Sequence, residues 1–300
     1  MEEILSVKNL YKNFGQFEIL KDVNMTVHKG DVYGFVGRNG AGKTTLIRVI
    51  TGLITAQKGS YELNVSKRLG AVSAIVEAPA IKAGLTGYDN LKLQAILLGL
   101  KDYDSKIKET LELVELPNDK KKAGNYSLGM RQRLAIASSL LGDPELLILD
   151  EPANGLDPKG MKEMRELIVK LNKEKGITFI ISSHILSELD KMATTYGFID
   201  NGTVIKEISA EDLHEHANKG VSFIYKVNTT EGVKEVLREK FNCYCEIVDD
   251  KTFTTDKEID SLDLGLALRE INVKIESFEQ KKEDLEDYFI NLLSDEGGNR

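Results

Sequence analysis

A short apolar segment near the start of the chain, Val32–Val36, runs directly into a glycine-rich loop with the sequence GRNGAGKT. The residues after this loop have helical spacing, because Leu46, Val49 and Ile50 recur on one face. Glycines let the loop curl so that backbone N–H groups point inward, and the positive end of the following helix dipole favours an anion. The strand–loop–helix junction therefore predicts a phosphate-binding loop in an α/β domain.

Two side chains of the loop carry the expected chemistry. Lys43 supplies a positive charge to the β- and γ-phosphates of a nucleotide, and the Thr44 hydroxyl is a ligand for Mg²⁺. The residues predicted to bind nucleotide in this region are Gly37, Arg38, Asn39, Gly40, Ala41, Gly42, Lys43, Thr44 and Thr45.

Two acidic residues follow a second apolar run farther along the chain. Residues 146–149 read as a buried strand, and Asp150 and Glu151 stand at its carboxyl end. Ligands bind at the carboxyl ends of strands in an open α/β sheet. We expect Asp150 to hold Mg²⁺ and Glu151 to polarise the water that attacks the γ-phosphate. A strand end with two acids can also be an ordinary surface turn, and the phosphate-binding loop decides between the two interpretations.

Composition limits the partners and the environment. The 300 residues carry a formal net charge of −8, which disfavours a nucleic-acid partner. Cys243 and Cys245 alone predict neither a disulfide framework nor a zinc site. The sequence shows no secretion signal and no run of the ~18 apolar residues that cross a bilayer. We therefore expect a soluble protein that does not insert into a membrane and reaches one only through a partner.

The periodicity of apolar residues predicts an alternating β/α domain interrupted by helices at about 85–142. Thr86 is a good helix N-cap, with Asp89 three residues later. The predicted strands up to residue 218 lie at 5–14, 19–27, 32–36, 60–65, 69–76, 146–149 and 177–181, with two more around the turn at 201–202. The predicted helices lie at 43–52, after Thr86, and at 105–115, 129–141, 158–175 and 185–192.

The character of the chain changes near residue 219, and residues 219–300 are predicted to form a small α+β accessory domain. Its strands are expected at 221–227, 244–248, 252–255 and 273–278, and its helices at 231–240, 261–271 and 281–293. The last residues, 294–300, are expected to fray. The sequence leaves the role of this domain open between support of a dimer and regulation.

Three further segments give the chain a family resemblance. The segment YSLGMRQRL at 126–134 resembles the signature segment of ABC ATPases and stands about 20 residues before Asp150. Residues 154–157, NGLD, look like the D-loop of that family, and His184 looks like its switch histidine. With the phosphate-binding loop and the paired acids, the resemblance covers residues 1 to about 215.

This resemblance implies a fold, cofactors and partners. The fold is an α/β P-loop ABC ATPase core at 1–218, with a parallel-rich sheet, an N-terminal antiparallel β subdomain and the helical insertion. The cofactors are ATP and Mg²⁺. Two ATPase domains form a head-to-tail homodimer or pseudo-dimer, in which Ser127, Gly129 and Asp157 contact the nucleotide bound by the other subunit. His184 contacts the γ-phosphate and orients Glu151.

An aromatic side chain is the expected contact for the adenine ring. Phe14 stands where the family stacks an aromatic residue on adenine, with Tyr11 as a less suitable substitute. Base–aromatic stacking contributes roughly 1–3 kcal/mol. The competing interpretation is that Phe14 is a core residue of its strand.

The chain departs from the family pattern at four positions. Leu128 and Met130 replace a glycine and a glutamine in the signature segment, and Arg38 replaces a frequent proline. Glu77 stands where the family usually has a glutamine that reaches Mg²⁺; a carboxylate can also bind this metal but adds negative charge. Glu77 and the signature variant SLGM at 127–130, with the terminal segment LEDYF at 285–289, resemble exporters of bacitracin-type and lantibiotic peptides.

The leading functional hypothesis is an ATP-hydrolysing motor that drives a separate membrane permease, most simply as an exporter of antimicrobial peptides or drug-like substrates. It lies in the cytoplasm against the inner face of the membrane, and the segment from Glu77 through the helical insertion docks the permease. The alternative is a non-transport ABC ATPase that acts on chromosomes, damaged DNA or ribosomes. A metal-cluster assembly factor is a third possibility. The absence of long heptad repeats and of a second phosphate-binding loop favours transport.

Overall fold

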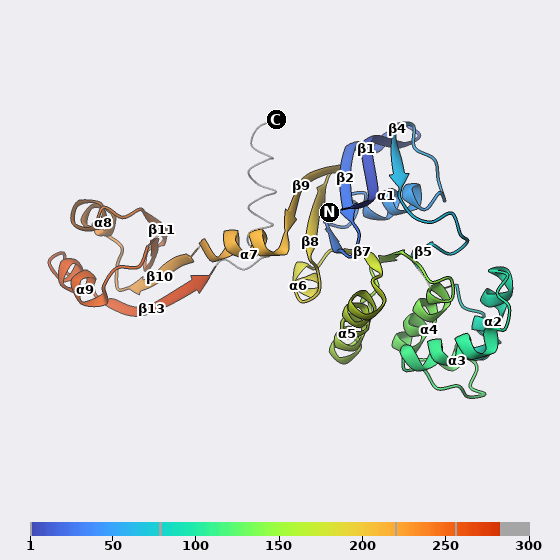
Figure 1. The fold of residues 1–300 in the computed structure, drawn as a ribbon. Coiled ribbons are helices and arrows are strands. Elements are labelled where there is room, and N and C mark those ends of the chain that lie inside the picture. The colour runs from blue at the N-terminus through green and yellow to red at the C-terminus, as the bar shows by residue number, and fades with distance from the viewer. Residues whose placement is uncertain (1, 78–79, 220, 256, 283–300) are drawn as a thin grey trace. The chain divides into compact units, whose positions relative to one another are not determined.

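The computed structural model describes residues 2–77, 80–219, 221–255 and 257–282. The chain divides into two compact units, Met1–Ala210 and Glu211–Arg300 (Figure 1). The predicted domain boundary at 218 stays a prediction, because the division between the units falls inside a helix, α7 (Ala210–Lys219). No described helix is long and apolar enough to cross a membrane.

A six-stranded sheet forms the centre of the first unit, in the order β5-β6-β7-β3-β8-β9. Its first five strands are parallel and β9 is antiparallel to β8. The strands are β3 (Val32–Val36), β5 (Val72–Ile75), β6 (Leu146–Asp150), β7 (Thr178–Ser183), β8 (Thr195–Asp200) and β9 (Thr203–Ser209). Every residue of β3, β6 and β7 is buried, which explains their continuous apolar runs.

A second, antiparallel sheet carries the N-terminus, in the order β2-β1-β4. It consists of β1 (Glu3–Phe14), β2 (Phe17–His28) and β4 (Lys58–Leu63). Leu5 and Val7 of β1 join Leu46 of α1 (Lys43–Ile50) and Ile148 of the central sheet in one buried cluster. The helix that begins at the phosphate-binding loop is therefore anchored to both sheets, and the predicted antiparallel β subdomain is confirmed.

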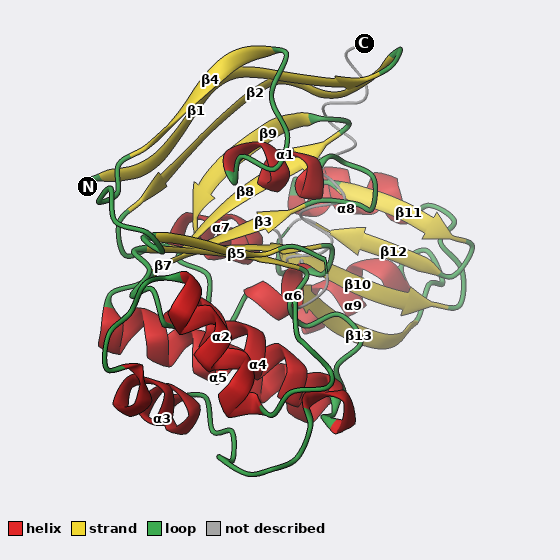
Figure 2. Cartoon of the chain, turned by 90° about the vertical axis from the view of Figure 1, so that its right-hand side faces the viewer, coloured by secondary structure: helices red, strands yellow, loops and turns green. Residues whose placement is uncertain are grey.

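Helices of the predicted insertion lie together with α5 on one side of the central sheet (Figure 2). Thr86 and Asp89 form the expected capping box at the start of α2, because each side chain accepts the other residue's backbone N–H. The insertion contains α2 (Gly87–Leu97), α3 (Tyr103–Leu113), a 3₁₀ turn (Ala123–Asn125) and α4 (Leu128–Leu140), and α5 (Pro158–Lys175) follows β6.

Three sequence-based assignments between residues 69 and 219 differ from the structure. The helix expected at 185–192 is a single turn, α6 (Leu186–Leu189). The strand expected at 69–76 begins only at Val72; Leu69, for which the alternation suggested a strand, is 70% exposed. The helix α7 was not predicted, since its apolar residues are few. Each error concerns a short segment whose structure depends on its neighbours more than on its own periodicity.

The second unit holds a four-stranded antiparallel sheet in the order β11-β12-β10-β13. Its elements are β10 (Val221–Val227), α8 (Val233–Phe241), β11 (Cys245–Asp249), β12 (Thr252–Thr255), α9 (Ser261–Arg269) and β13 (Ile275–Lys282). Tyr225 stacks on Phe253 with ring centroids 4.9 Å apart, inside a core that includes Cys243 and Cys245. Neither cysteine forms a disulfide within the described residues, and burial raises the pKa of Cys245 to about 11, so this thiol stays protonated at neutral pH.

The end of the second unit differs from the sequence-based expectation. β13 continues to Lys282, so Lys281 and Lys282 belong to a strand and not to the predicted closing helix. The rest of the helix expected at 281–293, and the fraying expected at 294–300, lie outside the described residues. The long strand pairs with β10 from Val221↔Lys282 to Val227↔Ile275, and this backbone pairing outweighs the polar side chains that suggested an earlier end.

Phe253→Ala should lower the free energy of unfolding of the second unit by about 3–5 kcal/mol, the usual cost of deleting a buried phenyl ring. Phe253 is fully buried at the centre of β12. Urea denaturation followed by circular dichroism measures the change. Val248→Ala is the matched control, because Val248 is 59% exposed on β11 of the same sheet. A loss below about 1 kcal/mol at Phe253 would contradict the assigned core.

Candidate nucleotide-binding and hydrolysis site

Three neighbouring strands bring the predicted motifs to one edge of the central sheet. β7 lies between β6 and β3, and the parallel registers Asp150↔Ser182 and Val36↔Ser183 align the carboxyl ends of all three. The glycine-rich loop, the paired acids and His184 each follow one of these ends. The fold therefore assembles residues that lie up to 147 positions apart, from Gly37 to His184.

Two glycines of the loop are required by close contacts. A Cβ atom at Gly37 would lie 2.5 Å from the carbonyl oxygen of Ile199 in β8. Gly42 has a φ of 111°, and a Cβ there would lie 2.8 Å from Leu20 in β2. Only glycine avoids these clashes. The loop is thus pressed against both sheets, which fixes the start of α1.

Lys43 is held inside the loop that it follows. Its ammonium group donates hydrogen bonds to the carbonyl oxygen of Gly37 at 2.7 Å and to that of Arg38 at 3.3 Å. The same Nζ atom lies 3.4 Å from Oε1 of Glu151. With its side chain only 6% exposed, Lys43 is a buried cation that can exchange these oxygen partners for phosphate oxygens.

Thr44 and Asp150 form the part of the site that suits a magnesium ion. The Thr44 hydroxyl donates to Oδ2 of Asp150 at 2.8 Å, and the Ser182 hydroxyl donates to Oδ1 at 2.5 Å. Hydroxyl and carboxylate oxygens are the hard ligands that Mg²⁺ prefers beside the phosphates of a nucleotide. These residues therefore fit the predicted ion. Ser182 was missed by the sequence reasoning; the signal for it was a hydroxyl residue at the end of an apolar strand.

Glu151 lies in a left-handed backbone conformation, with φ at 50°. Its backbone N–H donates to the Ser182 hydroxyl at 3.0 Å, which holds the turn. Oε2 of Glu151 lies 2.9 Å from Nδ1 of His184. Such backbone strain in a non-glycine residue clusters at functional sites. The carboxylate–imidazole pair is suitable for binding and orienting a water molecule.

These residues surround an open cavity of about 370 Å³. Phe14 lies at its rim, 47% exposed, with the Lys12 ammonium 5.1 Å from the ring centroid. Its exposure disfavours the core interpretation of this residue. Ile19 and Asn154 line the cavity although the sequence reasoning did not assign them to it. The described residues that line it are Phe14, Ile19, Asn39, Gly40, Gly42, Lys43, Thr44, Thr45, Glu151, Asn154 and His184.

The other predicted loop residues serve the cavity indirectly. Gly37 and Arg38 present their carbonyl oxygens to Lys43. The carbonyl oxygen of Ala41 accepts the N–H of Gly202 at 3.0 Å, which ties the loop to the turn between β8 and β9.

Besides Gly37, Arg38 and Ala41 of the loop and Asp150, four predicted residues are not among the described residues that line the cavity. Glu77 is 65% exposed and forms an ion pair with Arg48 of α1. Ser127 caps α4 by accepting the N–H of Met130 at 3.2 Å, and Gly129 lies in the first turn of that helix. Asp157 caps α5 in the same way, through Gly160 at 2.9 Å. Their assigned roles in binding nucleotide or metal stay predictions.

Comparison with known proteins agrees with this geometry. The sequence profile of the ABC transporter family matches residues 20–154. The chain is 36% identical to the bacitracin transport ATP-binding protein of Enterococcus faecalis, over 99% of this chain and 98% of that protein. The corresponding protein of Bacillus licheniformis is 38% identical, over 98% of each chain. The chain belongs to the ABC transporter family. As a family member it is an ATP-binding subunit and an ATPase.

Two further proteins, one compared by sequence and one by structure, are similar to this ABC subunit. The lantibiotic transport ATP-binding protein SrtF of Streptococcus pyogenes is 43% identical over 73% of this chain and 98% of that protein. A solved ATP-binding subunit of an ABC transporter superposes with a TM-score of 0.63 at 28% identity, over 71% of this chain and 92% of that one. The predicted fold class is thereby confirmed.

Proposed function

We propose that this chain is the ATP-hydrolysing subunit of an exporter for antimicrobial peptides of the bacitracin or lantibiotic type, and that it drives a separate membrane permease. The observation that carries the ATPase part is that Lys43, Thr44 and the Glu151–His184 pair line one cavity, while Asp150 accepts the hydrogen bond of the Thr44 hydroxyl. The relatives named for bacitracin transport are similar over nearly the whole chain, which supports the export part.

The mechanism assigns each group one task. Lys43 exchanges its bonds with the loop carbonyls for the β- and γ-phosphate oxygens of ATP. Thr44 and Asp150 are the residues that would hold Mg²⁺, which adds positive charge at the phosphates when bound, whereas Glu77 is engaged by Arg48. Glu151 polarises the attacking water, and His184 keeps the Glu151 carboxylate oriented. Phe14 at the rim stacks on the adenine ring.

A second ATPase domain completes the site in this proposal. Ser127, Gly129 and Asp157 lie at the N-termini of two helices, where unpaired N–H groups and the helix dipole favour an anion. Their proposed target is the γ-phosphate bound by the other subunit of a head-to-tail homodimer or pseudo-dimer. This arrangement accounts for their absence from the described residues that line the nucleotide cavity of their own chain.

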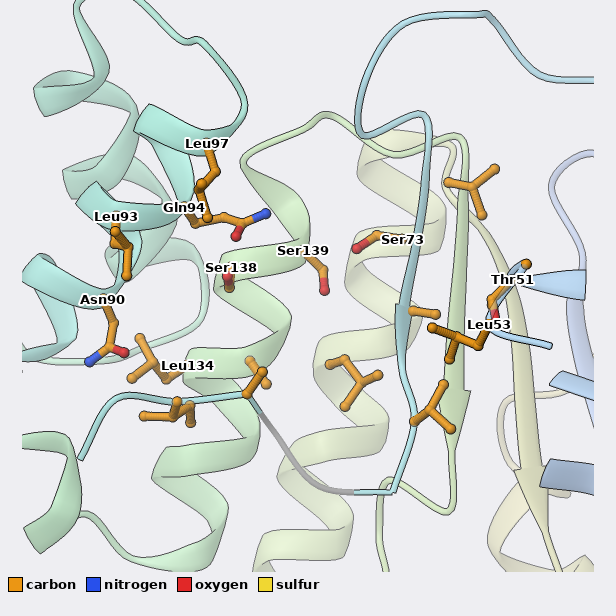
Figure 3. A pocket seen from close by; sticks show the side chains of 18 of the residues that line it. Thr51, Leu53, Ser73, Asn90, Leu93, Gln94, Leu97, Leu134, Ser138 and Ser139 are labelled. Carbon is orange, nitrogen blue, oxygen red and sulfur yellow. The ribbon is translucent and has the colours of Figure 1, made fainter. Parts of the chain in front are cut away.

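A large groove is the proposed docking site for the permease. It has a volume of about 910 Å³ and lies between α2 and α4 on one side and β5 with the end of α1 on the other (Figure 3). Leu93 and Leu97 of α2 stand at its wall, 40% and 67% exposed, so apolar surface is available to a partner. Val76 lines the groove and is followed by Glu77, so the groove wall adjoins the start of the segment predicted to dock the permease.

Leu97→Glu should reduce recovery of the permease with this chain by about tenfold or more, because a charge would enter an apolar contact. Copurification from detergent-solubilised membranes, with identification of the permease by mass spectrometry, measures the effect. Ile96→Glu is the matched control: Ile96 is 55% exposed on the same helix but is not among the described residues that line the groove. Equal recovery of permease with both variants would exclude this groove as the docking site.

The same experiment separates transport from the alternative function. The wild-type chain should bring down a membrane permease, which places it on the cytoplasmic face of the membrane through that partner. A DNA- or ribosome-associated ATPase, or an assembly factor, would instead copurify with no permease. The names of the relatives favour transport.

A further inference from the structure

Arg48 lies on α1 four residues after Thr44, so the two side chains share one face of the helix. Its guanidinium group forms an ion pair and hydrogen bond with Oε1 of Glu77. The Arg48 side chain is 35% exposed and that of Glu77 is 65% exposed. One face of the helix therefore presents the Thr44 hydroxyl in its first turn and, one turn later, the Arg48 guanidinium that pairs with Glu77.

The sheet register places Glu77 beyond the same edge of the sheet as the two catalytic acids. β5 pairs with β6 in parallel, with Ile75 opposite Leu149. Glu77 and Glu151 each lie two residues beyond this pair, and Asp150 precedes Glu151. Three carboxylates thus follow the carboxyl ends of two adjacent strands, at the edge of the sheet where a polyphosphate would bind. Their negative charges repel the nucleotide unless nearby cations cancel them.

We propose that Arg48 is a positioning residue that neutralises Glu77 and holds its carboxylate one helical turn away from the Thr44–Asp150 pair. The inference rests on the proposed nucleotide site. Lys43 lies 3.4 Å from Glu151, and the Arg48 ion pair serves Glu77 in a comparable way. Without Arg48, Glu77 is an uncompensated negative charge that can turn toward the phosphates.

The partial exposure of the Arg48–Glu77 pair limits how much the loss of Arg48 can weaken nucleotide binding. Solvent and salt screen charges at such a position, so the loss of Arg48 should weaken nucleotide affinity only about threefold to tenfold. The backbone of Arg48 makes a contact that does not depend on its side chain. Its carbonyl oxygen accepts the N–H of Leu53 at 2.9 Å, and a side-chain substitution keeps that bond.

The test measures binding of the non-hydrolysable ATP analogue adenylyl imidodiphosphate, with MgCl₂, by isothermal titration calorimetry. Arg48→Gln should bind it about threefold to tenfold more weakly than wild type, and the deficit should shrink at high salt. Adding Glu77→Gln to Arg48→Gln should restore most of the lost affinity, because the repelling charge is gone. Arg48→Lys, which keeps the charge, should stay close to wild type. Lys29→Gln is the control, since Lys29 forms an exposed pair with Glu2.

The outcomes separate this inference from the proposed function. If wild type binds the analogue and Arg48→Gln binds it equally well, the role of Arg48 is wrong and the nucleotide site stands. If the double variant is as weak as Arg48→Gln, Arg48 supports the fold and does not neutralise Glu77, which also overturns the inference. If wild type itself does not bind, the proposed site fails first. Should Arg48→Gln not fold, weak binding by a folded Arg48→Lys would equally contradict the charge argument.

Discussion

Glu151→Gln should still bind ATP but hydrolyse it at least about a hundredfold more slowly, which is the usual contribution of a general base. The amide has nearly the shape of the carboxylate, so the turn held by Ser182 can persist. It carries no negative charge with which to polarise a water molecule. Phosphate release measures hydrolysis, and calorimetry measures binding. Size-exclusion chromatography with ATP should show an accumulated dimer, because closure proceeds while hydrolysis does not.

The same strand supplies a matched control for this substitution. Glu145 stands at the opposite end of β6, where its carboxylate accepts the Ser66 hydroxyl and lies 3.7 Å from Arg68. Glu145→Gln removes one negative charge from the same region of sequence and should leave turnover unchanged. Nearly intact turnover in Glu151→Gln would show that another group activates the water.

Much of this site could be predicted from sequence because its motifs are local and the sheet is parallel. The glycine-rich loop and the paired acids each follow an apolar strand, and parallel strands bring their carboxyl ends to one edge. His184 is different. A lone histidine after a strand has no local signal, and only its resemblance to the switch histidine selected it. The 2.9 Å contact between His184 and Glu151 supplies the physical reason for that selection.

The parts that sequence could not supply are contacts between distant side chains. The bond from Ser182 to Asp150 and the pair between Arg48 and Glu77 join residues 32 and 29 positions apart. No periodicity reports such pairs, because they depend on strand order. The order β5-β6-β7-β3 was likewise beyond reach, since the same strands in another order would give the same alternation.

The sequence-based predictions of short elements were wrong for a related reason. A single turn such as α6 has too few residues for a helical repeat. The extension of β13 into Lys281 and Lys282 depends on backbone pairing with β10, and the side chains give no sign of it. Long, strongly periodic segments were placed well by comparison, as α5 shows with the predicted bounds Pro158–Lys175.

Lys43→Ala should weaken ATP binding about tenfold to a hundredfold, the range expected when a charged hydrogen bond to phosphate is lost. Lys43 is buried and already surrounded by oxygen atoms, two from loop carbonyls and one from Glu151. Its removal takes away the only side-chain cation that the proposed mechanism assigns to the β- and γ-phosphates. It also leaves the Glu151 carboxylate without this cation, so repulsion adds to the lost attraction. Calorimetry with ATP in the presence of MgCl₂ measures the affinity.

Lys257→Ala tests whether this loss is specific to the phosphate site. Lys257, in the second unit, likewise donates to two backbone carbonyl oxygens, those of Phe241 at 3.0 Å and Asn242 at 2.9 Å. Its substitution removes the same kind of lysine–carbonyl contact at a residue that is not among the described residues lining the nucleotide cavity, so affinity for ATP should not change. Unaltered affinity in Lys43→Ala, with both variants folded, would mean that the glycine-rich loop does not grip the polyphosphate. In that case Lys43 only stabilises its own loop, and its substitution would lower the unfolding temperature without changing ATP binding.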